Sequence, residues 1–260
     1  MVCPGRVILS KTATLLIRGG YVALPDDEAT VLENGAVAIR DGLIDAVGPA
    51  SGIAARYPDA EIIDVSGKLI MPGLINAHTH LYSSLARGTT AAIEPSSDFT
   101  EILQHMWWRL DRALTEEDIR LSASVGAIDL IRNGTTTIFD HHASQTNIDG
   151  SLSLIAHKVG RAGIRANICF EVSDRHGRDV RLAGMSENER FARGLSGSND
   201  SGRLGASIGL HARFTLDDDT LAAASGLGRD LNVGCHIHVA EDVADVQDSI
   251  RRSGFRVVER

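Results

Sequence analysis

The chain has 260 residues, of which 43% are hydrophobic and 23% charged, and this balance excludes a disordered or collagen-like protein. Its formal net charge is −8, from 26 basic and 34 acidic residues, and the basic residues are scattered. Neither a nucleic-acid-binding nor a membrane-binding surface is therefore predicted, and a small-molecule substrate is the expected partner.

Two further features bear on location and redox state. The longest apolar stretches, such as Ala13–Ile17 and Leu69–Ile75, are much shorter than the roughly 20 residues of a membrane span, and no signal peptide is recognisable. We therefore expect a cytoplasmic protein. Its cysteines, Cys3, Cys169 and Cys235, are widely spaced, which favours reduced thiols over a disulfide framework or a thiolate metal site.

The first predicted domain, residues 1–70, has the pattern of β structure. Short β-rich runs separated by turn residues lie at Leu15–Leu24, Ala36–Arg40, Leu43–Val47 and Glu61–Val65. Asp41-Gly42 separates the second run from the third, and this dipeptide favours the two-residue turn of a hairpin, in which both residues have φ > 0. We expect a hairpin over residues 36–47.

The second predicted domain, residues 71–260, alternates apolar runs with helix-length amphipathic segments. The apolar runs are Leu74–Ala77, Thr135–Phe139, Ala166–Val172, Ala206–Leu210 and Val233–Val239. Strands that alternate with helices predict a parallel sheet or barrel with the helices outside.

Several helix ends are marked locally. Thr115 precedes Asp118 by three residues, which predicts a capping box, and Gly134 marks the helix end; Thr215 and Asp218 predict a second capping box. An apolar stripe predicts a later helix before Gly254, formed by Val243, Val246 and Ile250. The polar segment 173–203 is expected to be a long loop near the substrate, because loops at the carboxyl ends of barrel strands carry function.

Two histidines close the first apolar run, in the sequence Asn76-Ala77-His78-Thr79-His80. Because residues two apart on a strand point to the same face, both imidazoles can reach one metal ion. A His-x-His pair alone is a weak signal. Here it stands at a strand end, and a second pair follows.

The second pair, His236-Ile237-His238, ends the fifth run and is followed by Glu241. A centre that activates water needs metal ligands and a nearby base, and His238 and Glu241 could supply both. The alternative is an inward polar layer with a hydrogen-bonded core histidine and a glutamate at a helix start. The two clusters together favour the metal centre.

The order of motifs resembles the amidohydrolase superfamily, in the aminohydrolase branch that contains atrazine and triazine hydrolases, guanine deaminase and adenosine-type deaminases. The matching motifs are Pro72-Gly73-Leu74-Ile75-Asn76-Ala77-His78-Thr79-His80, Gly134-Thr135-Thr136-Thr137, Gly209-Leu210-His211-Ala212 and His236-Ile237-His238-Val239-Ala240-Glu241. Within this branch, two further runs resemble the SsnA-type aminohydrolases: Phe139-Asp140-His141-His142-Ala143-Ser144 and Glu171-Val172-Ser173-Asp174-Arg175. The likeness covers nearly the whole chain from about residue 14.

The resemblance implies roles residue by residue. His78, His80 and His238 would be metal ligands, and Glu241 would be the proton shuttle. His211 would contact the substrate, although a hydrogen bond that closes the strand end is an equal alternative.

Other histidines and the tryptophan pair receive no role. His236 is expected to lie one layer below the site, as a structural residue. His141 and His142 are adjacent on a strand, so at most one of them faces inward. Trp107 and Trp108 are adjacent on a predicted helix, so at most one is in the core and the other at the mouth of the site; core packing is favoured for either.

The resemblance also bears on the number of metal ions. Binuclear members of this superfamily bridge their ions with a carboxylated lysine on the fourth strand. The lysines of this chain are Lys11, Lys68 and Lys158, and none lies within 205–213. One divalent metal is expected, with Zn²⁺ as the first choice and Fe²⁺ as the alternative.

These features predict a metal-dependent hydrolase acting on carbon–nitrogen bonds other than peptide bonds. The expected reaction is deamination of a cyclic amidine, such as a purine, pyrimidine or triazine, through a metal-activated water. Two alternatives are an amide or lactam hydrolase with the same metal site, and a catalytically incomplete fragment that at most binds metal.

The expected fold is an incomplete (β/α)8 TIM-type barrel with a small amino-terminal β-sandwich portion. About five strand–helix units are present, where eight close a barrel. Family members place a further His on the sixth strand and an Asp on the eighth, beyond residue 260. The chain is therefore expected to be the amino-terminal portion of such an enzyme. Whether it is active at this length is left open, as is a homodimer of the full-length protein.

Overall fold

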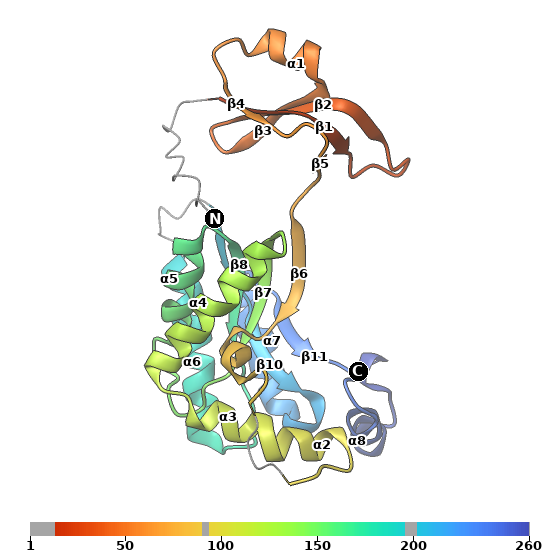
Figure 1. The fold of residues 1–260 in the computed structure, drawn as a ribbon. Helices are drawn as coiled ribbons and strands as arrows, with labels where there is room; N and C mark the ends of the chain where they lie inside the picture. The colour runs from red at the N-terminus through yellow and green to blue at the C-terminus, as the bar shows by residue number, and fades with distance from the viewer. Residues whose placement is uncertain (1–13, 90–93, 196–201, 260) are drawn as a thin grey trace. The chain divides into compact units, whose positions relative to one another are not determined.

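The computed structural model describes residues 14–89, 94–195 and 202–259. The chain divides into two compact units, Met1–Gly73 and Leu74–Arg260, and each has its own sheet and its own buried core (Figure 1). Within the described ranges, no helix combines the length and the apolar composition needed to cross a membrane.

The first unit is a sheet with one helix packed on it. Its strands are β1 (Leu15–Ala23), β2 (Val31–Arg40), β3 (Leu43–Pro49), β4 (Glu61–Asp64) and β5 (Leu69–Ile70). They run in the order β3-β2-β1-β4, and β5 also pairs with β1. The predicted hairpin is confirmed, because β2 and β3 pair antiparallel, and Asp41 and Gly42 take φ of +53° and +79°, as a type I′ turn requires.

The sequence did not predict helix α1 (Ala50–Arg56) of this unit. Its Ile53 is buried with Leu16, Ala36 and Ala38 of the sheet, and the two alanines leave room for the helix to approach. A seven-residue helix with one large apolar side chain is too short to show a 3.6-residue period.

The second unit carries the parallel strands. One sheet contains β6 (Leu74–Thr79), β7 (Thr135–His142), β8 (Arg165–Phe170) and β9 (Leu204–Ala206), and a second contains β10 (Ile208–Ala212) and β11 (Cys235–His238). A parallel bridge between Val172 and Leu210 links the two sheets. Each strand therefore lies parallel to the one before it, as in a TIM-type barrel. Among the described strands the series is open, with β6 and β11 at its ends, as the incomplete barrel predicts.

Helices follow these strands along the chain (Figure 1). They are η1 (Leu81–Ala86), α2 (Phe99–Ile102), η2 (Leu103–Trp107), α3 (Trp108–Ala113), α4 (Glu116–Arg132), α5 (Ser151–Ala162), α6 (Arg178–Leu195), η3 (Arg213–Thr215), α7 (Asp218–Leu231), α8 (Val243–Ser253) and η4 (Val257–Glu259). The largest core cluster joins Ile138 of β7 and Ile168 of β8 to Ile119 of α4 and Leu152 of α5. Burying each such side chain contributes roughly 1.5–3 kcal/mol, which fixes the strands against the helices.

The prediction of a long loop over residues 173–203 is wrong, because α6 occupies most of it. Polar residues on its buried face hid the helical pattern. Glu187 accepts hydrogen bonds from the backbone N–H groups of Gly150 and Leu152, each at 3.0 Å, and so caps the start of α5. Asn188 is also buried, and it hydrogen bonds to the backbone of Phe170.

One of the two predicted capping boxes is correct. Thr115 and Asp118 cap α4 reciprocally, as expected. The second is wrong, since α7 begins at Asp218 after Asp217. Thr215 lies in η3, and its hydroxyl donates to the carbonyl of Ala212 at 3.0 Å. This local side-chain bond replaces the helix cap.

The predicted helix before Gly254 is present as α8, but its buried face is not the apolar stripe. Val243 and Ile250 are 64% and 47% exposed within the described residues. Asp245 and Ser249 are the buried side chains of this helix. Asp245 accepts a hydrogen bond from the Ala240 backbone N–H at 2.8 Å, which ties the helix to the end of β11.

Candidate metal centre

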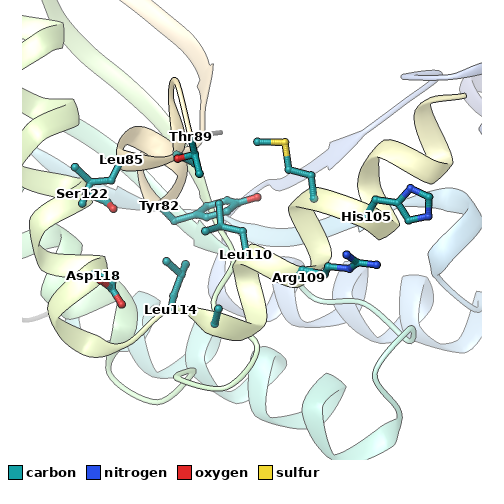
Figure 2. Close-up of a pocket in the computed structure, with 12 residues that line it drawn as sticks. Tyr82, Leu85, Thr89, His105, Arg109, Leu110, Leu114, Asp118 and Ser122 are labelled. Atoms are coloured by element: carbon teal, nitrogen blue, oxygen red, sulfur yellow. The ribbon is translucent and has the colours of Figure 1, made fainter. Parts of the chain in front are cut away.

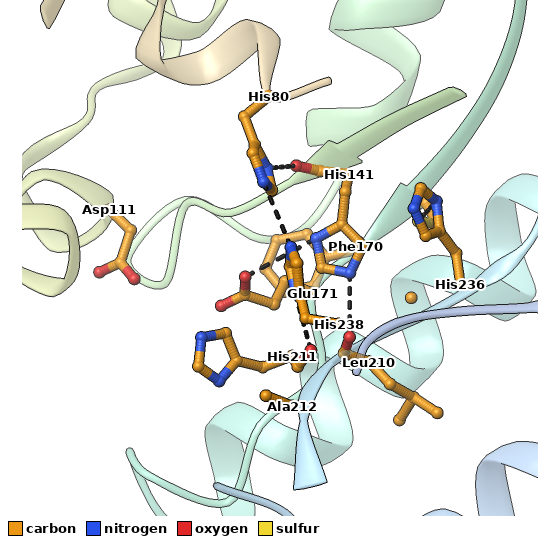
Figure 3. Close-up of polar contacts among 12 residues, drawn as sticks. His80, Asp111, His141, Phe170, Glu171, Leu210, His211, Ala212, His236 and His238 are labelled. Atoms are coloured by element: carbon orange, nitrogen blue, oxygen red, sulfur yellow. Dashed lines mark hydrogen bonds and ion pairs between the residues drawn. The ribbon is translucent and has the colours of Figure 1, made fainter. Parts of the chain in front are cut away.

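A cluster of imidazoles lies at the carboxyl ends of the parallel strands (Figure 3). His78 lies in β6 and His80 directly follows that strand, while His141 comes from β7 and His236 and His238 come from β11. The rings are close: the centroids of His80 and His238 are 5.2 Å apart, and those of His141 and His238 are 4.5 Å apart. The two His-x-His motifs therefore meet, although 158 residues separate His80 from His238.

Hydrogen bonds to backbone carbonyls fix the tautomers of two of these rings. His80 Nδ1 lies 2.7 Å from the carbonyl of His141, and His238 Nδ1 lies 2.7 Å from the carbonyl of His211. A carbonyl only accepts, so each Nδ1 carries the proton and each Nε2 carries a lone pair. These two Nε2 atoms face one another at 3.3 Å.

His78 is held by another imidazole. Its Nδ1 lies 2.9 Å from His236 Nε2, and His236 Nδ1 lies 3.8 Å from the Sγ of Cys169. Burial, together with the neighbouring His80 and His238, lowers the pKa of His78 to about 4. The neutral form, which can bind a metal, is thus favoured at neutral pH. His236 was expected below the site without a role, yet it contacts a predicted ligand directly.

The donor set fits a divalent cation. One ligand nitrogen from each of His78, His80 and His238 can be chosen so that all three lie within 4.8 Å of one another. Ligands at Zn–N distances of about 2.0–2.1 Å in a tetrahedron lie roughly 3.3–3.4 Å apart, which matches the 3.3 Å between the two Nε2 atoms. Two lone pairs that face each other repel, so a cation between them relieves an unfavourable contact.

A second donor set shares His238 and adds two residues that sequence reasoning left without a role, His141 and Glu171. Both are buried, at 0% and 4% exposure. Glu171 follows β8 and forms an ion pair with Arg175 at 2.7 Å, and Arg175 reaches Asp111 of α3 at 2.5 Å. Burial alone would raise the pKa of Glu171, but Arg175, and after it His211 and His141, hold that pKa well below its usual range.

A pocket of about 270 Å³ opens beside the cluster. Its lining includes His80, His238, His211 and Glu241, together with Trp107 and Trp108. Neither tryptophan is in the core, because both line this pocket from adjoining ends of η2 and α3. Arg175 lies over the Trp108 ring at 5.2 Å, a cation–π contact that holds the indole in place.

His211 and Glu241 lie on the pocket wall with defined chemistry. The Thr215 hydroxyl donates its single proton to the Ala212 carbonyl. Its oxygen can therefore only accept from the His211 ring, and His211 Nδ1 donates to it at 2.6 Å. Burial lowers the pKa of His211 to about 4, which leaves Nε2 as an acceptor in a neutral ring. Desolvation raises the pKa of Glu241 above its usual value, which favours a carboxyl group that exchanges protons nearer neutral pH.

The remaining candidates fall outside this cluster. His142 is fully buried on the opposite face of β7, where its Nε2 contacts the Ser144 hydroxyl at 2.8 Å, so only one of the adjacent histidines faces the cluster. A larger cavity of about 440 Å³ is lined by Tyr82, Leu110 and Leu114, with His105 and Arg109 also on its wall (Figure 2). This cavity shares Tyr82 with the smaller pocket but contains none of the predicted site residues.

A family model described as the amidohydrolase family matches residues 69–257. The chain therefore belongs to the amidohydrolase family, as the motifs implied. A second model, the imidazolonepropionase-like composite domain of bacteria, matches residues 35–60 within the first unit.

Curated relatives are aminohydrolases. The 5-methylthioadenosine/S-adenosylhomocysteine deaminase of Symbiobacterium thermophilum is 30% identical over 240 residues, which are 92% of this chain and 52% of that protein. The 5'-deoxyadenosine deaminase of Methanosarcina mazei is 28% identical over 242 residues, covering 93% and 52%. The chain thus spans about half the length of the curated relatives it matches.

Solved structures share the fold. An adenosine deaminase from Xanthomonas campestris with bound zinc superposes with a TM-score of 0.81 at 25% identity, over 95% of this chain and 54% of that chain. The guanine deaminase from Bradyrhizobium japonicum has a TM-score of 0.77 at 20% identity, over 95% and 55%. The triazine hydrolase from Arthobacter aurescens has a TM-score of 0.76 at 22% identity, over 95% and 57%. The expected fold class, a TIM-type hydrolase barrel present in part, is thereby confirmed.

Proposed function

We propose that this chain carries the metal-binding half of a hydrolase that deaminates a cyclic amidine, such as a purine, pyrimidine or triazine. The observation that carries the proposal is the convergence of His78, His80 and His238 beside a pocket that also contains Glu241. Relatives named as deaminases of adenosine-type compounds support the reaction class.

The proposed cofactor is one divalent ion, Zn²⁺ or alternatively Fe²⁺, held by His78, His80 and His238. All three donors are imidazoles, which suit both metals, and a relative was solved with bound zinc. A bound ion of this kind supplies Lewis acidity and lowers the pKa of water to about 7.

Residues of this chain would then carry out proton transfer and substrate binding. Glu241 takes a proton from water at its carboxylate and returns it to the departing nitrogen, which its raised pKa favours. His211 orients the substrate. Because its Nδ1 is committed to Thr215, Nε2 would accept a hydrogen bond from a substrate N–H. Trp107 and Trp108 offer apolar walls to a flat ring.

We further propose that residues 1–70 are a β-sandwich portion and residues 71–260 a partial barrel. The division of the chain into two compact units, with the boundary between Gly73 and Leu74 in the sequence, supports this proposal. The cytoplasmic location, the small heterocyclic substrate and a homodimer of the full-length protein stay predictions.

The test is ammonia release from adenosine-type, guanine-type and triazine substrates by the zinc-loaded chain and by a protein extended to the length of its relatives. We expect activity in the extended protein and its loss by a factor of about 10²–10⁴ in Glu241→Gln. Unchanged turnover in Glu241→Gln would remove this residue from the proton transfer. A carboxylate product without ammonia would favour the amide or lactam hydrolase, and activity only in the extended protein would favour the incomplete fragment.

A further inference from the structure

Two buried groups beside the metal centre are not used by the proposed reaction. His141 Nε2 donates to the carbonyl of Leu210 at 3.0 Å, so its Nδ1 carries a lone pair. This Nδ1 has no hydrogen-bond partner among the described residues. Facing it at 3.7 Å is Oε2 of Glu171, also an acceptor. A lone pair and a carboxylate oxygen therefore face each other in the interior.

This arrangement is costly unless something positive lies between the two atoms, because buried acceptors need a partner. The separation of 3.7 Å exceeds the roughly 2.7–3.2 Å of an N–H···O hydrogen bond. A metal ion with bonds of about 2.0–2.2 Å to nitrogen and oxygen can span donors up to roughly 4.2 Å apart. The distance suits a cation better than a shared proton.

His141 and Glu171 are each held in place by a neighbouring group, as metal ligands in proteins usually are. Metal-binding histidines donate their other N–H to a carbonyl, and metal-binding carboxylates are themselves hydrogen bonded. His141 meets the first condition through Leu210. Glu171 is held by an ion pair instead: its other oxygen, Oε1, lies 2.7 Å from Arg175 Nη1, and Asp111 holds the far side of that guanidinium.

The position between His141 and Glu171 is separate from the site formed by His78, His80 and His238. His238 belongs to both donor sets, but its Nδ1 is committed to the His211 carbonyl. Its one remaining lone pair can therefore serve only one ion. When the first ion takes His238, His141 and Glu171 remain as the protein donors of a neighbouring position. A position with two protein donors binds more weakly than one with three.

We propose that His141 and Glu171 hold a second divalent cation beside the ion of His78, His80 and His238. The absence of a lysine from the fourth strand predicted a single ion. Glu171 supplies a carboxylate from the neighbouring strand end instead. The second position would be filled at higher metal concentration, and its occupancy does not depend on the reaction proposed above.

The test counts zinc bound to the 260-residue chain by equilibrium dialysis over a range of free zinc concentrations. We expect about two equivalents at saturation in the wild type, bound with different affinities, and about one tightly bound equivalent in Glu171→Gln. His78→Ala, which touches only the first donor set, would weaken the tight site instead. Glu189→Gln, at a half-exposed glutamate of α6 outside both donor sets, is the matched control and keeps both equivalents.

A readout on the wild type guards against variants that fail to fold. With Mn²⁺ as the probe, two neighbouring ions couple magnetically, so the electron paramagnetic resonance signal per ion falls as the second equivalent binds. Saturation of the wild type at about one equivalent, with no coupling, would overturn the proposal whatever the variants do. That result would leave the first site and the proposed deamination standing.

Discussion

His236 shows how one side chain outside the donor set can govern a metal ligand. Its Nε2 lies 2.9 Å from His78 Nδ1, so the contact occupies this nitrogen of His78 and leaves the other nitrogen for the ion. We predict that His236→Phe weakens zinc binding by about 10–100-fold, the usual effect of losing such a partner. His236→Asn, which keeps an acceptor, should lose less. Competition with a chromogenic chelator measures both, and equal affinity in wild type and His236→Phe would refute this role.

Asp140 predicts a pH dependence of stability. Its Oδ1 accepts from the Leu81 backbone N–H at 2.7 Å, and burial raises its pKa to about 7 from 3.8. The folded state therefore binds this proton more tightly than the unfolded state. The protonated Asp140 carboxyl group therefore adds to the free energy of unfolding. This stabilisation is complete below about pH 4 and is lost as pH rises toward 7, by about 1.4 kcal/mol per pH unit.

The matching variant is Asp140→Asn, which stays neutral at every pH. Without added metal, we expect the variant to gain stability relative to the wild type between pH 4.5 and 7, as measured by urea unfolding. Asp149→Asn, at a fully exposed side chain, is the control and should follow the wild type. Parallel pH profiles for wild type and Asp140→Asn would show that the carboxyl group ionises without cost.

The candidate site was predictable at the residue scale where spacing carried the signal. His78, His80 and His238 could be found because two His-x-His motifs end predicted strands. His141 and Glu171 could not, because their pairing depends on how β7 and β8 lie against each other. The one sequence hint was the four-residue spacing of Glu171 and Arg175, which is common in any chain.

At the scale of elements, α6 joins β8 and β10, which belong to separate sheets. Asn188 Oδ1 accepts from the backbone N–H of Phe170 at 2.8 Å, and its Nδ2 donates to the Phe170 carbonyl at 2.9 Å. Oδ1 also lies 3.4 Å from the Gly209 N–H of β10. A Cβ at Gly209 would approach the Phe170 carbonyl oxygen to 2.2 Å, so only glycine allows the two strands this close.

Asn188→Ala should therefore destabilise the second unit by roughly 2–5 kcal/mol, because it leaves two buried backbone groups without partners. Urea unfolding followed by circular dichroism measures the loss. Glu189→Ala, at the next and half-exposed residue of the helix, should change stability by less than about 0.5 kcal/mol. Similar losses in both variants would mean that helix propensity, not the Asn188 bridge, sets the effect.

Elements with a repeated pattern were predictable, and elements defined by single contacts were not. The alternation of apolar runs with amphipathic segments located the parallel strands, and the Thr115 box located the start of α4. The helix α6 was missed because Glu187 and Asn188 are polar on its buried face. The start of α7 was misplaced because Thr215 turns back to the Ala212 carbonyl.

At the scale of the whole molecule, the metal centre joins the two ends of the strand series in the second unit. His78 lies near the end of β6 and His80 directly follows it, while His238 ends β11, and the strands between β6 and β11 connect these two ends. Zinc binding and the folding of this unit should therefore be coupled, since an ion that binds only the folded state stabilises it. The order of motifs predicted this arrangement, and the expected incomplete barrel predicted the open series of described strands.

The coordination of zinc in the chain loaded with one equivalent tests the central claim most directly. Zinc K-edge X-ray absorption should show about three imidazole nitrogens near 2.0–2.1 Å, with any remaining position taken by oxygen. His80→Ala should lower the imidazole count. Sulfur scattering near 2.3 Å, or a shell of oxygen without imidazole, would contradict a centre built from His78, His80 and His238.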